Sequence, residues 1–100
     1  MNMDAYTVFV RDSFPELPKS LHCALGLASE VGEVLGVLRK SRYEDGPFEE
    51  VDLIKLELGD VLFYLVAIAD TYGMTLENLA EANMTKLLTR RRLKREGTPK

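Results

Sequence analysis

The chain has 100 residues, of which 46% are hydrophobic and 29% are charged, and its formal net charge is −3. This length corresponds to one domain with a modest core, so we expect residues 1–100 to form a single domain whose basic tail frays from about residue 96. The apolar runs are too short for a transmembrane helix, the first residues lack the basic start of a signal peptide, and a single cysteine excludes an internal disulfide; these features predict a cytoplasmic protein without membrane contact.

Charge is distributed unevenly along the chain. Residues 1–85 carry 15 acidic and 6 basic side chains, whereas residues 86–100 carry 7 basic and 1 acidic side chains. The acidic body argues against broad nucleic-acid binding. The basic end fits either a phosphate-binding element or a solvated tail.

The first half of the chain predicts two helices. The first covers about residues 4–13, and two prolines in residues 14–18 end it. The second begins near residue 19 or 20 and extends to about residue 42. It contains Gly32 and Gly36 on one side, which would let another backbone approach closely. Since no segment alternates polar and apolar residues, we expect no strand and an all-α fold.

The second helix and the third, which extends from near Pro47 to about residue 72, each carry an acidic pair on their apolar face. The pairs are Glu30 with Glu33, and Glu57 with Asp60. Residues three apart project from the same side of a helix. A buried, unpartnered carboxylate costs several kcal/mol, roughly, unless it is protonated, paired or bound to a metal. The two pairs therefore predict a metal site.

The residue types in these pairs favour a hard cation. If the two helices form an antiparallel hairpin, their carboxylates meet at one locus, and oxygen donors select Mg²⁺ first and Mn²⁺ second. Zinc is disfavoured because His22 is the only histidine and Cys23 the only thiol. We expect His22 to lie on the surface and Cys23 to fill the core.

The third helix should end at Gly73, and Thr75 should cap a fourth helix that extends to about residue 95. On that helix Asn83, Lys86 and Arg90 share one face. An amide with two cations suits a phosphate-rich ligand. The alternative is an amphipathic helix whose long side chains extend past the core. Lys40 is a further candidate to contact phosphate.

Three segments together resemble the MazG-like nucleotide pyrophosphohydrolases of the all-α type. They read ALGLASEVGEV at 24–34, ELGDVLFY at 57–64 and NMTKLLTR at 83–90, within a match over about residues 20–92. The resemblance implies Mg²⁺-assisted hydrolysis of a nucleoside triphosphate to the monophosphate and pyrophosphate. It assigns the metal cluster to Glu30, Glu33, Glu57 and Asp60, and phosphate contacts to Asn83, Lys86 and Arg90.

We therefore expect a four-helix, homo-oligomeric pyrophosphohydrolase, dimeric or tetrameric, that uses Mg²⁺ or, in substitution, Mn²⁺. Glu30 or Glu33, more readily Glu30, would activate the attacking water. Tyr64 and the first helix are candidates to contact the base and sugar. Two alternatives remain: a non-catalytic nucleotide-binding regulatory module, and a helical protein that binds nucleic acid through its basic end.

Overall fold

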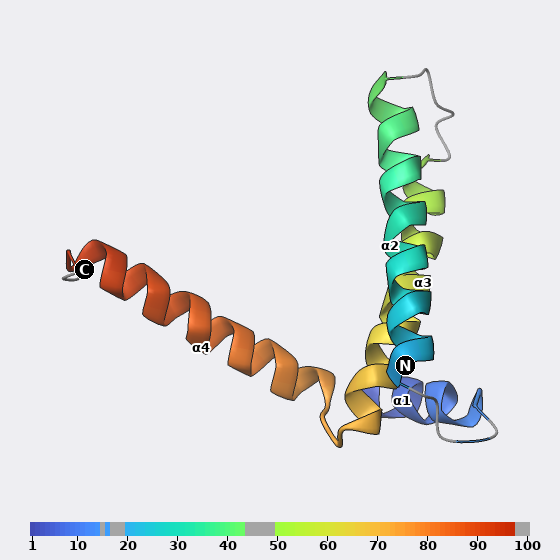
Figure 1. Ribbon diagram of the computed structural model, residues 1–100, viewed down its shortest axis with the longest axis horizontal. Coiled ribbons are helices and arrows are strands. Elements are labelled where there is room, and N and C mark those ends of the chain that lie inside the picture. Colours follow the sequence, from blue (N-terminus) through green and yellow to red (C-terminus); the bar gives the residue numbers. More distant parts are fainter. Residues whose placement is uncertain (15, 17–19, 44–49, 98–100) are drawn as a thin grey trace.

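The computed structural model describes residues 1–14, 16, 20–43 and 50–97. These residues form four α helices and no strand, which confirms the predicted all-α fold (Figure 1). The helices are α1 (Met3–Asp12), α2 (Ser20–Tyr43), α3 (Glu50–Thr71) and α4 (Leu76–Arg95). The turn expected around Pro47 and the tail after Gly97 lie outside the described residues. Among the described residues, no helix combines the length and apolarity that a membrane span requires.

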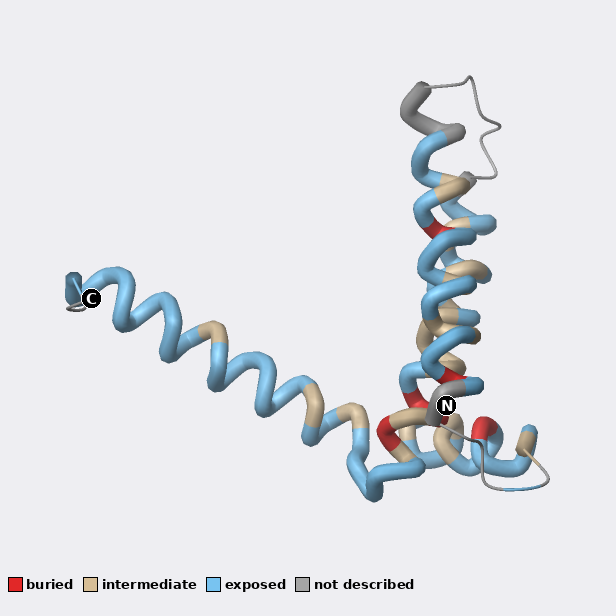
Figure 2. Tube along the Cα trace, viewed as in Figure 1, coloured by how far each residue is buried: buried red, intermediate tan, exposed pale blue. Residues whose placement is uncertain are grey.

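Helices α2 and α3 lie side by side as an antiparallel hairpin, and α1 crosses the end of the hairpin where α2 begins and α3 ends (Figure 1). Most of the buried residues lie where these three helices meet (Figure 2). Val10 of α1, Cys23 of α2, and Val66 and Ala67 of α3 form this core. The expectation that Cys23 fills the core is confirmed, and His22 is exposed as predicted.

A bidentate ion pair connects helix α1 to α3. Arg11 donates from Nε to Oδ2 of Asp70 at 2.9 Å and from Nη2 to Oδ1 at 2.7 Å. At its other end, the Asn2 side chain accepts a hydrogen bond from the N–H of Ala5 and so caps the helix. The position of α1 relative to the hairpin is therefore held by a charged hydrogen-bond pair as well as by apolar packing.

The corner between α3 and α4 has the predicted residues in the predicted places. Gly73 adopts a φ of +71°, and the N–H of Met74 donates to the carbonyl oxygen of Ala69 at 2.8 Å, which closes the last turn of α3. The Thr75 hydroxyl accepts from the N–H of Asn78, whose side chain accepts from the N–H of Thr75. This capping box starts α4 in a new direction, away from the hairpin (Figure 1).

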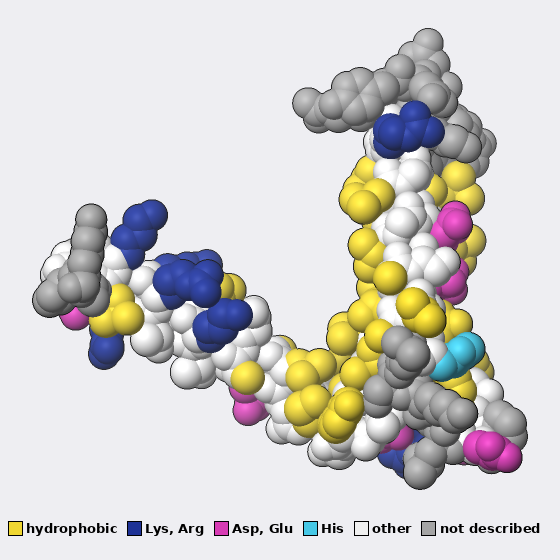
Figure 3. Space-filling view, in the orientation of Figure 1, with side chains coloured by type: hydrophobic (Ala, Val, Ile, Leu, Met, Phe, Trp, Pro, Cys, Tyr) yellow, Lys and Arg dark blue, Asp and Glu magenta, His cyan; other side chains and the backbone are white. Residues whose placement is uncertain are grey.

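Much apolar surface stays exposed on this chain. Apolar side chains cover much of the visible face of the α2–α3 hairpin, while Lys and Arg gather on the last half of α4 (Figure 3). The exposed apolar residues of the hairpin are Leu25, Val31, Leu35, Leu38, Val51, Leu53, Leu56, Leu58 and Leu65. Helix α4 packs against the core mainly through its first residue, Leu76. Four helices therefore do not enclose all the apolar surface that they carry.

Candidate metal centre

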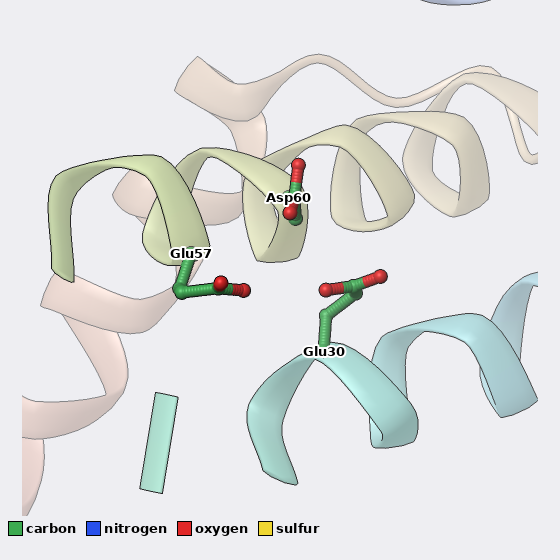
Figure 4. Close-up of side chains that lie close together, drawn as sticks. All are labelled: Glu30, Glu57 and Asp60. Carbon is green, nitrogen blue, oxygen red and sulfur yellow. The ribbon is translucent and has the colours of Figure 1, made fainter. Parts of the chain in front are cut away.

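Three carboxylates converge between α2 and α3. Glu30 of α2 points across the hairpin toward Glu57 and Asp60 of α3 (Figure 4). One oxygen from each lies within 4.8 Å of the others. The spacing of three residues puts Glu57 and Asp60 on one side of α3, and the hairpin supplies Glu30 from the facing helix. Oxygen atoms from two helices are thus close enough to bind one cation together.

The electrostatics of this cluster favour a bound cation. Burial raises the pKa of Glu30, and the negative charges of Asp60, Glu57 and Glu33 raise it further. Glu30 and Glu57 are half-buried, and Asp60 is exposed at the mouth of the site. Like charges held together in a partly dry setting repel one another unless a proton or a cation offsets them. The donor set consists of hard oxygens and fits Mg²⁺ or Mn²⁺.

Glu33 lies one turn of α2 beyond Glu30 and is exposed. It is not part of the group whose oxygens lie within 4.8 Å, although its charge contributes to the raised pKa of Glu30. The structure therefore brings together three of the four carboxylates singled out from the sequence. A role of Glu33 as a ligand or as a base for water requires its side chain to turn toward the cluster.

A cleft of about 300 Å³ opens beside the cluster and is lined by Glu30, Asp60, Phe63 and Tyr64. The Phe63 and Tyr64 rings meet edge to face at 5.3 Å. The sequence pointed to Tyr64, which follows Glu57 by two helical turns, but not to Phe63. The signal for Phe63 was its position three residues after Asp60, which puts both on neighbouring parts of the α3 surface.

Helix α1 contributes Tyr6 to the surroundings of the cluster. Burial raises the pKa of the Tyr6 phenol, and the negative charge of Asp60 raises it further. Tyr6 also stacks on Phe9 at a ring-centroid distance of 6.1 Å. A contact between the first helix and the base or sugar stays a prediction.

The residues considered for phosphate binding lie elsewhere. Asn83, Lys86 and Arg90 are exposed on α4, which leads away from the hairpin (Figure 1). One chain does not bring them to the carboxylates. The side chain of Lys40 lies outside the described part of the structure.

The chain is thus an all-α protein with a cluster of carboxylates, suited to a divalent cation, between two antiparallel helices. Residues 19–93 match the family model of the MazG nucleotide pyrophosphohydrolase domain. The chain belongs to this family, whose activity is the pyrophosphohydrolysis of nucleotides and which is typically metal-dependent.

Two known proteins are similar to this chain. The Gene 37 protein of Mycobacterium phage L5 is 32% identical over 73 residues, which are 70% of this chain and 64% of the phage protein. The crystal structure of iMazG from Vibrio DAT 722 superposes with a TM-score of 0.65 at 26% identity, over 92% of this chain and 97% of that one. The four-helix, MazG-like fold and the resemblance to this family are confirmed.

Proposed function

We propose that this protein hydrolyses ribo- or deoxyribonucleoside triphosphates to the monophosphate and pyrophosphate with the help of Mg²⁺. The single observation that carries the proposal is the convergence of Glu30, Glu57 and Asp60 between α2 and α3. Membership of the MazG family supplies the reaction class. Mn²⁺ would substitute, because the ligands are hard oxygens.

Glu30, Glu57 and Asp60, with Glu33 beside them, would hold the metal. When bound, a divalent cation polarises phosphate oxygens and lowers the pKa of water. Glu30 is the better candidate to orient the attacking water or take its proton, because it lies in the cluster while Glu33 is exposed outside it.

Asn83, Lys86 and Arg90 would hold the phosphate chain and the leaving pyrophosphate, with Lys40 as a further candidate. Since α4 leaves the hairpin of its own chain, these groups would come from a neighbouring copy in a dimer or tetramer. Tyr64 would contact the base or sugar from the cleft. In this proposal residues 1–100 act as one all-α domain of a cytoplasmic enzyme.

The test is a panel of ribo- and deoxyribonucleoside triphosphates incubated with Mg²⁺, with pyrophosphate, orthophosphate and monophosphate measured separately. We expect pyrophosphate and monophosphate in equal amounts. Orthophosphate released from a labelled γ-position in the first turnover would contradict attack at the innermost phosphorus.

The same panel separates the alternatives. Binding of nucleotide without turnover would indicate a non-catalytic regulatory module. Binding of nucleic acid whose affinity falls steeply with salt would indicate a nucleic-acid-binding protein. The compact carboxylate site instead predicts dependence chiefly on Mg²⁺.

A further inference from the structure

We infer that Phe63 and Tyr64 form a nucleobase-binding corner beside the carboxylates, and that Phe63 is the residue that selects nucleosides over bare polyphosphate. This inference rests on the proposed function and adds to it the part of the substrate that each side of the cleft recognises. The carboxylate side would take the metal-bound phosphates, and the aromatic side would take the base.

The cleft has two chemically different sides. Its four lining residues divide by chemistry into two carboxylates, Glu30 and Asp60, and two aromatic rings, Phe63 and Tyr64. Among these lining residues there is no cation, so nothing in the cleft competes with metal for the phosphates. Its volume of about 300 Å³ is at the lower end of the range for small-molecule sites. A planar base that lies against one of these aromatic side chains fits such a volume.

Gly26 of α2 leaves the space that the Tyr64 ring occupies. A Cβ atom at position 26 would lie 2.5 Å from Cε1 and 2.6 Å from Cζ of Tyr64. Any side chain there would push the tyrosine ring from its place. The absence of a side chain at Gly26, one turn before Glu30 on α2, thus lets the ring lie against the helix backbone. A glycine inside a helix is unfavourable, so this contact gives position 26 a specific role in shaping the cleft.

The Phe63 ring is held in place by two other aromatic rings. Its ring stacks on Phe14 at 5.7 Å with an interplanar angle of 27°, and it meets Tyr64 edge to face at an angle of 88°. Both rings also pack against the buried core. A ring held on two sides loses little freedom when a ligand binds it. Stacking of a base on such a ring tolerates all four bases, since every base has a π face.

The test compares Phe63→Leu with the wild-type protein in three calorimetric titrations, and Mg²⁺ is present in the two titrations with a phosphate ligand. The ligands are a nucleoside triphosphate with a non-hydrolysable α,β-methylene bridge, inorganic tripolyphosphate, and Mn²⁺ alone. We expect Phe63→Leu to weaken binding of the analogue about tenfold, within the range for losing one base–aromatic stack. Affinities for tripolyphosphate and Mn²⁺ should stay within about twofold of wild type, and Phe63→Tyr, which keeps the ring, should restore analogue binding.

Phe9→Leu is the matched control, because Phe9 is an exposed aromatic residue of α1 that does not line the cleft. Gly26→Ala is the second variant: alanine favours the helix more than glycine does, but it displaces the Tyr64 ring. It should weaken the analogue and leave tripolyphosphate unchanged. Unchanged analogue binding by Phe63→Leu, or equal losses for analogue and tripolyphosphate, would overturn the inference.

These outcomes are independent of turnover. A wild-type protein that binds the analogue through Phe63 but hydrolyses no triphosphate would refute the proposed reaction and keep the base corner. If the wild-type protein hydrolyses triphosphates and both variants have the same KM as the wild type, the proposed reaction stands and the base corner is refuted. A wild-type protein that binds tripolyphosphate as tightly as the analogue would also refute it.

Discussion

Glu30 is the residue in which the competing forces at this site are clearest. It faces two other carboxylates at close range, and burial and their charges raise its pKa. The metal-free protein therefore holds an arrangement that disfavours its own ionised form. A cation relieves this repulsion, so affinity for metal and strain in its absence have the same origin.

Replacing Glu33 with Gln, or Asp60 with Asn, should abolish turnover and leave the helical content intact. Removing one negative charge relieves crowding, so the metal-free variants should melt no lower than the wild type. Turnover and thermal melts followed by circular dichroism measure both effects. Asp52→Asn is the control, since Asp52 is exposed on α3 outside the cluster and should keep wild-type turnover. Wild-type rates from either site variant would refute the assignment.

Binding of Mn²⁺ should weaken with falling pH earlier than an ordinary glutamate would predict. Metal binding needs the ionised carboxylate, and the pKa of Glu30 is raised above its usual value, so protons compete from a higher pH downward. The folded metal-free protein binds the Glu30 proton more tightly than the unfolded chain does. Its free energy of unfolding therefore falls as pH rises from the ordinary glutamate pKa through the raised pKa of Glu30. Titrations at stepwise pH measure the affinity, and a constant value down to about pH 4.3, the usual glutamate pKa, would contradict the prediction.

At the scale of the helices, the position of α1 depends on its charged contact with α3. Asp70→Asn should lower the melting temperature slightly near neutral pH, because the Arg11 pair is lost. Hydrogen bonding from Arg11 lowers the pKa of Asp70. The pair therefore stabilises the fold above the ordinary aspartate pKa, and its contribution is lost as pH falls through the lowered folded value.

The melting difference between wild type and Asp70→Asn should thus disappear in acid. Glu81→Gln on the exposed surface of α4 serves as a control of equal charge change. A difference that persists undiminished at low pH would indicate that Asp70 acts through packing rather than charge.

The function of α4 can be tested on its exposed face. Lys86→Ala and Arg90→Ala should each weaken kcat/KM by about 1–3 kcal/mol, the range for losing a charged hydrogen bond. Arg92→Ala is the matched control, since it lies on a different side of the helix. Deleting residues 97–100 should have little effect, because the helix ends at Arg95. Two site variants with wild-type kinetics would leave α4 with a packing role alone.

At the scale of the whole molecule, the hairpin and α4 both expose apolar side chains, among them Leu35, Leu56 and Met84, which are 60%, 67% and 59% exposed. Surfaces of this kind mark association sites. We expect a dimer or tetramer at micromolar concentration, in which α4 of one copy lies near the carboxylates of another. Light scattering measures the mass, and a particle of 11.3 kDa would contradict this expectation.

Local chemistry made the helices predictable. Gly73 ends α3 because its φ of +71° suits glycine, and Thr75 caps α4 with its own hydroxyl. The i,i+3 spacing likewise puts Glu57 and Asp60 on one side of α3 whatever surrounds it. These features depend on residues within one or two turns of each other, so the sequence alone determined the four helices and the acidic faces.

Contacts between helices were decided only by the tertiary structure. Helical periodicity predicts which residues share one face of a helix. The rotation and packing of two helices decide which of their atoms come into contact. The sequence therefore assigned both Glu30 and Glu33 to the metal cluster, whereas in the fold Glu30 lies close to the carboxylates of α3 and Glu33 is exposed outside the cluster. The i,i+3 spacing puts Phe63 on the same part of α3 as Asp60, but only the packing of α2 against α3 makes both residues line one cleft. The direction of α4 was also undetermined, because one corner at Gly73 turns twenty residues of helix away from the hairpin.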